Sequence, residues 1–408
     1  MRDRDASARY LLLLLGGVGY FCLMFVWFSL PATLVPVMEE LELSNTQGGI
    51  LAGAVPAVYI PLALVTGLVA DRIGSRRTLT AALAIIGTAQ LLRSTAETFP
   101  AMLLWTLLLG VGATGITFGL PKLVAELFEP ERAGTMSSVY LVWSYVGTAT
   151  AFGIGRPFLQ PFLGGWRVLF LVTGAVVVGY AILWGAFGAF TRRRGLATPL
   201  GTGDPPAFTP GSIREDVTAV VAHREMRLLV VVGSMYLFLL HGLQGWLVTL
   251  LEVRGVPPET AGVVASLLVV GQIIGVLGVP PLAERFDRRK EAVVACGVVV
   301  AIASAALVGT VGLWAILPVA LVGLAAGGLS PLVRALPVEL AGIGPRLAAT
   351  AVGLVFAVGE IGGFLGPVLV GVLRDVTGTF TAGLALFAVC GLVIVAAGAA
   401  MDIDGREA

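Results

Sequence analysis

The sequence predicts an all-α membrane protein with twelve transmembrane helices, arranged as two pseudo-symmetric six-helix halves. Three observations predict this fold class. Of the 408 residues, 57% are hydrophobic and only 12% are charged, about half the charged fraction of a soluble protein. Apolar runs of about twenty residues, long enough to cross a bilayer as a helix, recur along the chain. A charged motif between two of these runs returns in the second half of the sequence.

Each apolar run is predicted to be a helix, because backbone polar groups in lipid must be satisfied within their own segment. The twelve predicted spans are approximately 10–36, 46–68, 78–93, 100–126, 133–155, 166–190, 227–250, 259–281, 292–311, 313–340, 347–372 and 380–400. The first run follows a basic start, as a signal peptide would. It continues to about Pro36 and has no clear cleavage site, so we interpret it as the first span.

The distribution of Arg and Lys predicts the orientation, since cytoplasmic loops carry an excess of these residues. With the N-terminus inside, 19 of the 26 basic residues fall on the cytoplasmic side and five in outer loops or span ends. Both termini are therefore expected in the cytoplasm, with the chain in the cell membrane. Topology explains the basic residues, so they indicate no nucleic-acid partner.

The sequence contains no motif of catalysis or metal binding. Cys22, Cys296 and Cys390 lie in apolar runs and lack the spacing of a metal site or a disulfide framework. No P-loop, G-x-S-x-G or zinc motif is found. We therefore expect neither an enzyme nor a cofactor.

The stretch GLVADRIGSRRTLT, residues 67–80, places a charged cluster between the second and third spans. A related stretch, PPLAERFDRRK at 280–290, lies at the equivalent place between the eighth and ninth spans. Glu284, Arg285, Arg289 and Lys290 take the places of Asp71, Arg72, Arg76 and Arg77. The repeat predicts an N-terminal half (1–190), a cytoplasmic linker with a short interfacial helix (191–226) and a C-terminal half (227–408) in the same orientation.

The first stretch resembles the loop 2–3 signature of the major facilitator superfamily, G-x-L-a-D-r-x-G-r-r. The twelve spans, the second copy, the basic central loop and GGFLGPVLVG in span 11 are similar to this family over the whole chain. Ser75 replaces a usual basic residue, and Asp287 replaces the glycine of the second copy. The resemblance implies the major facilitator fold, with a solute site near mid-membrane lined by spans 1, 4, 7 and 10.

The resemblance also implies that the charged cluster is a cytoplasmic gate. Gly67 would let span 2 approach a neighbouring helix, and Asp71 would accept hydrogen bonds at the N-terminus of span 11. The arginines would pair with Glu126 or Glu131 at the end of span 4. The residues assigned to the gate are Gly67, Asp71, Arg72, Gly74, Arg76, Arg77, Glu126, Arg132, Glu284, Arg285 and Arg289. The alternative is that the cluster only sets the topology.

Charged residues within spans are costly and therefore indicate function. Lys122 in span 4 and Arg334 in span 10 lie at nearly equivalent places in the two halves. Two cations facing one cavity would suit an anionic solute. The alternative is that Lys122 pairs with Glu126 at i,i+4 and extends to the surface, while Arg334 pairs with Glu339 or a lipid phosphate.

Polar and aromatic residues within spans are further candidates for the solute cavity. His241 and Gln244 in span 7 share a helix face. Tyr59 and Gln272 precede the loop acids of their respective halves by the same interval, which indicates equivalent places in the two halves. Aromatic residues in spans more often serve packing, and a histidine can simply bond a neighbouring helix. The candidates are His241, Gln244, Trp246, Tyr59, Gln272 and Trp27.

Glu360 in the segment AVGEIGGFLGP of span 11 is the acid nearest to the predicted bilayer centre. A buried carboxyl group can take and release a proton during a transport cycle, and so can the imidazole of His241. Glu360 and His241 are therefore the candidates for proton coupling. The alternative is that Glu360 stays neutral and bonds a nearby carbonyl group.

These features predict a secondary active transporter that moves a small anionic solute by alternating access, with proton symport as the candidate coupling. GLPKLVAELFEPERAG and GGWR resemble most the branch of the superfamily that handles cyanate, nitrate and organic anions. Nitrate-type porters have an arginine in span 2, roughly where Tyr59 lies, and another in span 8; this sequence has neither. The expected partners are the solute and the lipid bilayer, with the chain as a monomer.

Two other functions remain open. A drug/proton antiporter would have a Gly-Pro pair in span 5, and here Arg156 separates Gly155 from Pro157. A transporter-like receptor without flux would be expected to carry a signalling domain, and the sequence shows none.

Overall fold

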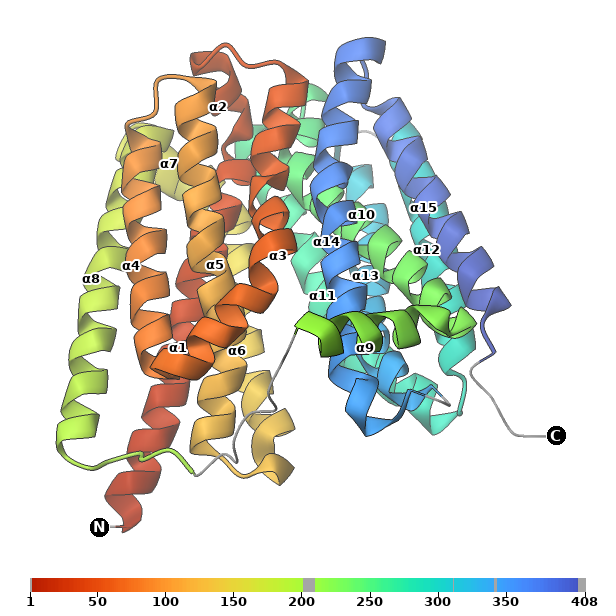
Figure 1. Cartoon of the computed structure of the whole chain (residues 1–408). Coiled ribbons are helices and arrows are strands. Elements are labelled where there is room, and N and C mark those ends of the chain that lie inside the picture. Colours follow the sequence, from red (N-terminus) through yellow and green to blue (C-terminus); the bar gives the residue numbers. More distant parts are fainter. Residues whose placement is uncertain (1, 201–209, 311, 341–342, 403–408) are drawn as a thin grey trace. The chain divides into compact units, whose positions relative to one another are not determined.

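The computed structural model describes residues 2–200, 210–310, 312–340 and 343–402, which contain helices and no strand (Figure 1). The helices group into two compact units. Unit 1 comprises Met1–Leu43 and Ala57–Pro206, and unit 2 comprises Ser44–Pro56 and Ala207–Ala408. The third helix therefore begins in unit 2 and ends in unit 1.

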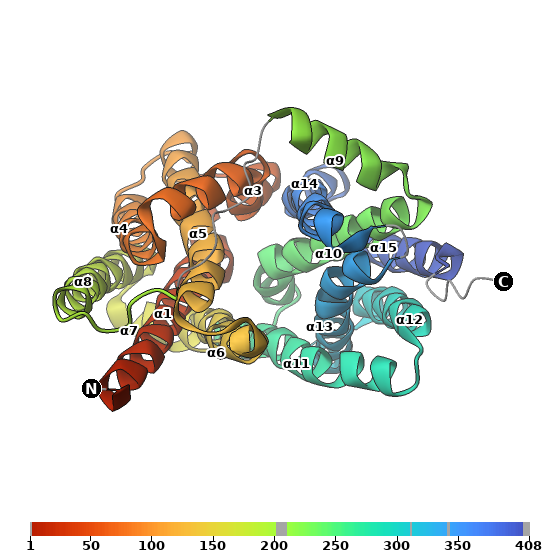
Figure 2. The same cartoon turned by 60° about the horizontal axis from the view of Figure 1, so that its bottom comes forward.

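Unit 1 holds the helices that precede the central linker. They are α1 (Arg2–Ala32), α2 (Leu34–Glu40), most of α3 (Asn45–Ile73), α4 (Ser75–Ser94), α5 (Phe99–Leu127), α6 (Pro130–Thr150), α7 (Gln160–Leu163) and α8 (Trp166–Arg193). A π-helix, η1 (Ala151–Leu159), continues α6 into α7. α4 lies between α5 and α8 (Figures 1 and 2), and α1 packs against α6.

Unit 2 holds the remaining helices. They are α9 (Pro210–Ala222), α10 (Arg224–Val253), α11 (Pro258–Arg285), α12 (Arg289–Gly309), the 3₁₀ turn η2 (Gly312–Ala315), α13 (Ile316–Glu339), α14 (Gly344–Thr377) and α15 (Thr381–Ala400). α9 is the first helix after α8. It runs crosswise to the long helices of its unit and contacts α10 and α14 (Figure 1).

The packing of unit 2 repeats that of unit 1. The pairs α10–α14 and α12–α15 correspond to α1–α6 and α4–α8. The two loop motifs also share a backbone conformation with positive φ, since Gly74 has φ +82° and its counterpart Asp287 has φ +49°. Asp is among the few residues that tolerate this left-handed conformation, so the departure from glycine preserves the turn. The predicted fold class of two equivalent six-helix halves is confirmed.

Glycines let equivalent helix pairs approach closely. In the α4–α8 pair, a Cβ atom at Gly87 would lie 2.7 Å from the backbone N of Val178. In the α12–α15 pair, a Cβ atom at Gly391 would lie 2.4 Å from the backbone N of Ala301. Helix backbones thus touch where small residues meet, as packing within a membrane favours.

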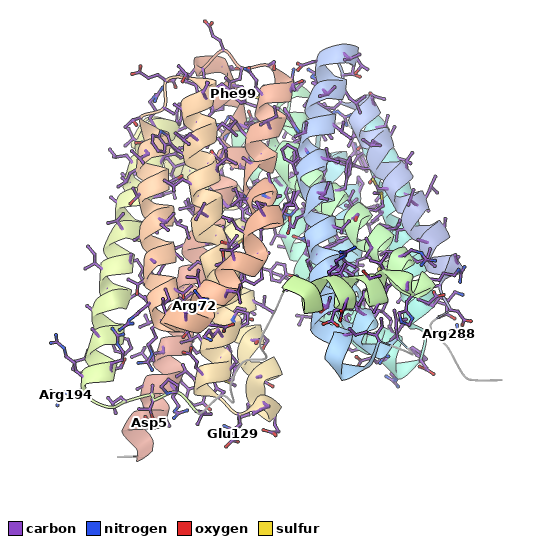
Figure 3. The ribbon with its side chains drawn as sticks, in the orientation of Figure 1. Asp5, Arg72, Phe99, Glu129, Arg194 and Arg288 are labelled. Carbon is purple, nitrogen blue, oxygen red and sulfur yellow. The ribbon has the colours of Figure 1, made fainter. Side chains whose placement is uncertain are left out.

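Ten helices in the described residues are long and apolar enough to cross a membrane. α4 and α6 coincide with the predicted spans 78–93 and 133–155 but are not among the ten, because three arginines lower the mean hydropathy of α4 and many Ser, Thr and Tyr residues lower that of α6. In unit 1, Asp5, Arg72, Glu129 and Arg194 lie toward one end of the helices and Phe99 lies at the other (Figure 3). The chain is a multi-pass membrane protein.

Candidate functional site

Two helices of unit 2 bring ionisable side chains together within their apolar packing. His241 on α10 and Glu360 on α14 are 10% and 14% exposed, and His241 Nε2 lies 3.8 Å from Glu360 Oε2. This oxygen is buried and has no hydrogen-bond partner among the described residues. Arg334 on α13 is exposed and lies against Phe356, one helical turn before Glu360 on α14. The two sequence candidates for proton coupling therefore meet.

Arg334 is directed back along its own helix. Its Nη1 donates to the carbonyl oxygen of Ser330 at 3.1 Å and also to the Ser330 hydroxyl. The guanidinium lies 4.7 Å from the centre of the Phe356 ring on α14. Nε and Nη2 have no partner among the described residues, so both can donate to a ligand. The side chain of the predicted partner Glu339 lies outside the described residues.

Gly363 makes room for the pair of ionisable groups. A Cβ atom at this position would lie 2.9 Å from both Glu360 Oε2 and His241 Cδ2. Any side chain here would therefore displace one of them. The sequence analysis missed Gly363, Ser330 and Phe356; the spacing of four residues between Ser330 and Arg334 was the available signal for Ser330.

The other span 7 candidates are buried. Gln244 Nε2 lies 3.5 Å from Gln272 Oε1 on α11, and both residues are at most 5% exposed. Trp246 is 2% exposed and donates from Nε1 to the carbonyl oxygen of Pro367 at 2.8 Å. Trp246 thus ties α10 to α14 inside unit 2, and its role at a solute cavity stays a prediction.

In unit 1, Tyr59 and Trp27 form an aromatic cluster. The Tyr59 hydroxyl and Thr117 Oγ1 on α5 are 2.8 Å apart. The ring centre of Tyr59 lies 6.1 Å from that of Trp27 and 6.4 Å from that of Phe118. Tyr59 is therefore placed by a hydroxyl contact that the sequence did not predict.

The charged residues of the predicted gate have partners that differ from the predicted ones. Lys122 forms an ion pair with Asp71 instead of Glu126, with side chains 22% and 40% exposed. Glu126 accepts hydrogen bonds from the backbone N and hydroxyl of Ser75, at 3.2 and 2.5 Å. Ser75 thus binds Glu126 directly, at the position where the family signature has a basic residue. Within the part of the chain that the structure describes, no atom lies within 4 Å of a Cβ atom at Gly67, and the role predicted for this glycine stays a prediction.

Arg76 is buried and anchors the chain that follows α8. It donates to Thr191 Oγ1 at 3.1 Å and to the carbonyl oxygen of Ala197. Burial in this loop region lowers the pKa of the guanidinium below its usual value. The negative charge of Glu126 acts in the opposite direction and raises the pKa of Arg76. The hydrogen bonds of Arg76 stabilise unit 1.

The remaining gate residues lie at the ends of the helices. Arg132 donates to the Tyr10 hydroxyl at 3.4 Å. Arg285 lies 5.9 Å from the centre of the Phe286 ring. The exposed members of the predicted gate are Asp71, Arg72, Arg77, Arg132, Glu284 and Arg285, and Arg289 is half-buried. Among the described residues, no group of three His, Cys, Asp or Glu could hold a metal ion.

Two equivalent groups of membrane-spanning helices, with an ionisable pair enclosed within unit 2, define a polytopic membrane protein. The family model of the Major Facilitator Superfamily matches residues 16–367. The chain belongs to this superfamily, as its loop motif predicted.

Its relatives are transporters rather than enzymes. It is 28% identical to the "Uncharacterized transporter YycB" of Bacillus subtilis, over 91% of this chain and 88% of that protein. It is 28% identical to the 3-(3-hydroxy-phenyl)propionate transporter of Escherichia coli, over 88% and 90% of the two chains. It is 26% identical to the cyanate transport protein CynX of Escherichia coli, over 89% and 90%.

A solved structure shares the fold. The bacterial homologue of the human lysosomal transporter Spinster, in an inward-facing and unoccupied conformation, superposes with a TM-score of 0.74. The match covers 96% of each chain at 20% sequence identity, so it supports the architecture alone.

Proposed function

We propose that the protein moves a small anion across the cytoplasmic membrane by alternating access, in symport with protons, as a monomer with both termini in the cytoplasm. The observation that carries this proposal is the enclosed pair of His241 and Glu360, together with the exposed Arg334 that contacts the same helix, α14, at Phe356. Ionisable groups within membrane spans are retained for function, because burying them is costly. In this proposal Arg334 binds the anion, and the carboxyl–imidazole pair carries the proton.

The geometry of Arg334 supports an oxyanion as the solute. Nε and Nη2 lie side by side on one edge of the planar guanidinium, which can donate two parallel hydrogen bonds to a carboxylate. Contact with Phe356 holds the plane in position. The relatives named above include transporters of a phenylpropionate, which carries a carboxylate, and of cyanate, an inorganic anion.

Lys122 is the second cation available to the anion. It is paired with Asp71 in unit 1, so a solute that bound Lys122 would have to displace a carboxylate. Arg334 has no carboxylate partner among the described residues, and two of its nitrogen atoms are unoccupied there. The proposal therefore assigns the main anion contact to Arg334.

Uptake by purified protein in liposomes tests the proposal. Radiolabelled 3-(3-hydroxyphenyl)propionate and cyanate are the probes, with a pH gradient that is alkaline inside and with protein-free liposomes as the control. We expect accumulation of at least one probe that a protonophore abolishes and that other carboxylates inhibit. Inhibition by lipophilic cations but not by carboxylates would favour drug/proton antiport. Binding without flux would favour a receptor.

A further inference from the structure

The start of α3 is held by one carboxylate of α14. Asp375 Oδ1 accepts hydrogen bonds from the backbone N and the Nδ2 of Asn45, at 3.0 and 2.8 Å. Asp375 Oδ2 accepts from the backbone N and the hydroxyl of Thr46, at 2.7 and 2.6 Å. All three residues belong to unit 2, whereas α3 from Ala57 onward belongs to unit 1. We call this set of four hydrogen bonds the outer latch, after its predicted side of the membrane.

Small residues bring the two helix backbones into contact beneath the outer latch. A Cβ atom at Gly49 would lie 2.4 Å from the carbonyl oxygen of Pro367, and one at Gly371 would lie 2.2 Å from the carbonyl oxygen of Asn45. Backbones in such contact have few interlocking side chains. The two helices can therefore separate and meet again without repacking large side chains.

The position of Asp375 argues against a role within its own helix. It lies in the last turn of α14, where the helix dipole disfavours an anion, and it faces the N-terminus of α3, where the dipole favours one. Asp71 is placed similarly, in the last turn of α3, and it pairs with Lys122 of α5. Each acid is thus stabilised by a different helix, and the two ends of α3 are held by different units.

We infer that Asp375 is a gating residue, whose hydrogen bonds to Asn45 and Thr46 close the outer side and are exchanged for water when that side opens. The four bonds are exposed, so water can replace each of them at little cost. This inference rests on the alternating-access cycle proposed above. It needs neither the proposed solute nor proton coupling.

Thiol labelling tests the inference without a solute. Ala52 is 6% exposed and lies on the latched part of α3, so Ala52→Cys places a reporter thiol beneath the latch. The buried native residues Cys296 and Cys390 report any general loosening of unit 2. Asp375→Asn is compared with the matched control Glu97→Gln, which neutralises an exposed acid in the predicted outer loop between α4 and α5. A membrane-impermeant maleimide is applied, and alkylation is followed peptide by peptide.

We expect Asp375→Asn to speed alkylation of the reporter thiol about threefold or more, while Glu97→Gln and the native cysteines keep their rates. If Asp375→Asn is not produced, Thr46→Val removes one of the four bonds and should give a smaller rise. Unchanged reporter labelling would overturn the inference. An equal rise at Cys296 and Cys390 would also overturn it, because Asp375 would then act only in holding the fold together.

Discussion

Replacing Glu360 by Gln should uncouple solute movement from the pH gradient and leave solute binding and folding intact. Glutamine has nearly the same size and shape, but its amide cannot exchange a proton. Oε2 of Glu360 has no hydrogen-bond partner among the described residues, so the substitution breaks no hydrogen bond there. We therefore expect the free energy of unfolding to change by less than about 1 kcal/mol.

The size of the uncoupling follows from the number of groups. One carboxyl group exchanges one proton per cycle, and one proton moved with one monovalent anion makes transport electroneutral. A gradient of one pH unit then supplies about 1.4 kcal/mol, which corresponds to roughly tenfold accumulation. The Glu360→Gln variant should equilibrate its solute without accumulation, while solute counterflow continues at close to the wild-type rate.

The assay compares accumulation and counterflow of the same radiolabelled probe in matched liposomes. Roughly tenfold accumulation by the Glu360→Gln variant would refute the assignment, and His241→Gln would be the next variant. Wild-type uptake that ignores both the pH gradient and a protonophore would refute the coupling role of both residues. Loss of counterflow together with accumulation would instead show that Glu360 contributes to solute binding.

Other substitutions test the surroundings of this pair and the other half of the chain. Gly363→Ala should separate His241 from Glu360 and weaken accumulation, and it should lower the free energy of unfolding by roughly 1–3 kcal/mol. The control is Gly353→Ala on the same helix, which has open space around it and should leave thermal unfolding unchanged. Arg334→Gln should raise the KM for an anionic probe about tenfold or more, because hydrogen bonds to charged groups contribute roughly 1.5–3 kcal/mol; an unchanged KM would leave Arg334 a packing role against Phe356. A double-mutant cycle of Lys122→Gln and Asp71→Asn should give a coupling of about 0.2–1 kcal/mol in unfolding, since both groups are partly exposed, and a coupling of zero would contradict the pair.

The positions of the long helices could be read from the sequence because a membrane allows few solutions. Apolar runs located all twelve, and the internal repeat supports α4, which hydropathy alone does not select. The places where a helix is interrupted within a span could not be predicted from the sequence. Span 1 was expected to continue to Pro36, but α1 ends at Ala32 and α2 begins at Leu34. Prolines near the break remove backbone donors, while the surrounding residues stay apolar and hide it from a hydropathy pattern.

The identity of the site residues was more predictable than their contacts. His241 and Glu360 stand out because polar groups are costly in an apolar span. That they meet depends on the rotation of α10 and α14 about their axes, which contacts at glycines such as Gly242 and Gly363 determine. Lys122 shows the same limit, since local spacing favoured Glu126 on the next turn and the structure pairs it with Asp71 on another helix.

The strengths of the proposed gate contacts suit a transporter that must visit two states. Four exposed hydrogen bonds at Asp375 contribute about 2–6 kcal/mol in gross terms, at ~0.5–1.5 kcal/mol each, and the partly exposed pair of Lys122 and Asp71 contributes ~0–1 kcal/mol. A ligand can shift an equilibrium only by its difference in affinity for the two states, and moving a population from 1:99 to 99:1 requires about 5.5 kcal/mol. An anion bound by Arg334 can therefore drive the change of state only if its difference in binding free energy is at least as large as the free energy of the closing contacts. A buried ion pair differs from the outer latch, because removing one partner of such a pair leaves an uncompensated buried charge at a cost of about 3–5 kcal/mol, whereas the exposed groups of the latch can bind water when they separate. The four hydrogen bonds that the Asp375 carboxylate accepts are exposed to water, and their sum of about 2–6 kcal/mol is of the same order as the free energy that solute binding must supply.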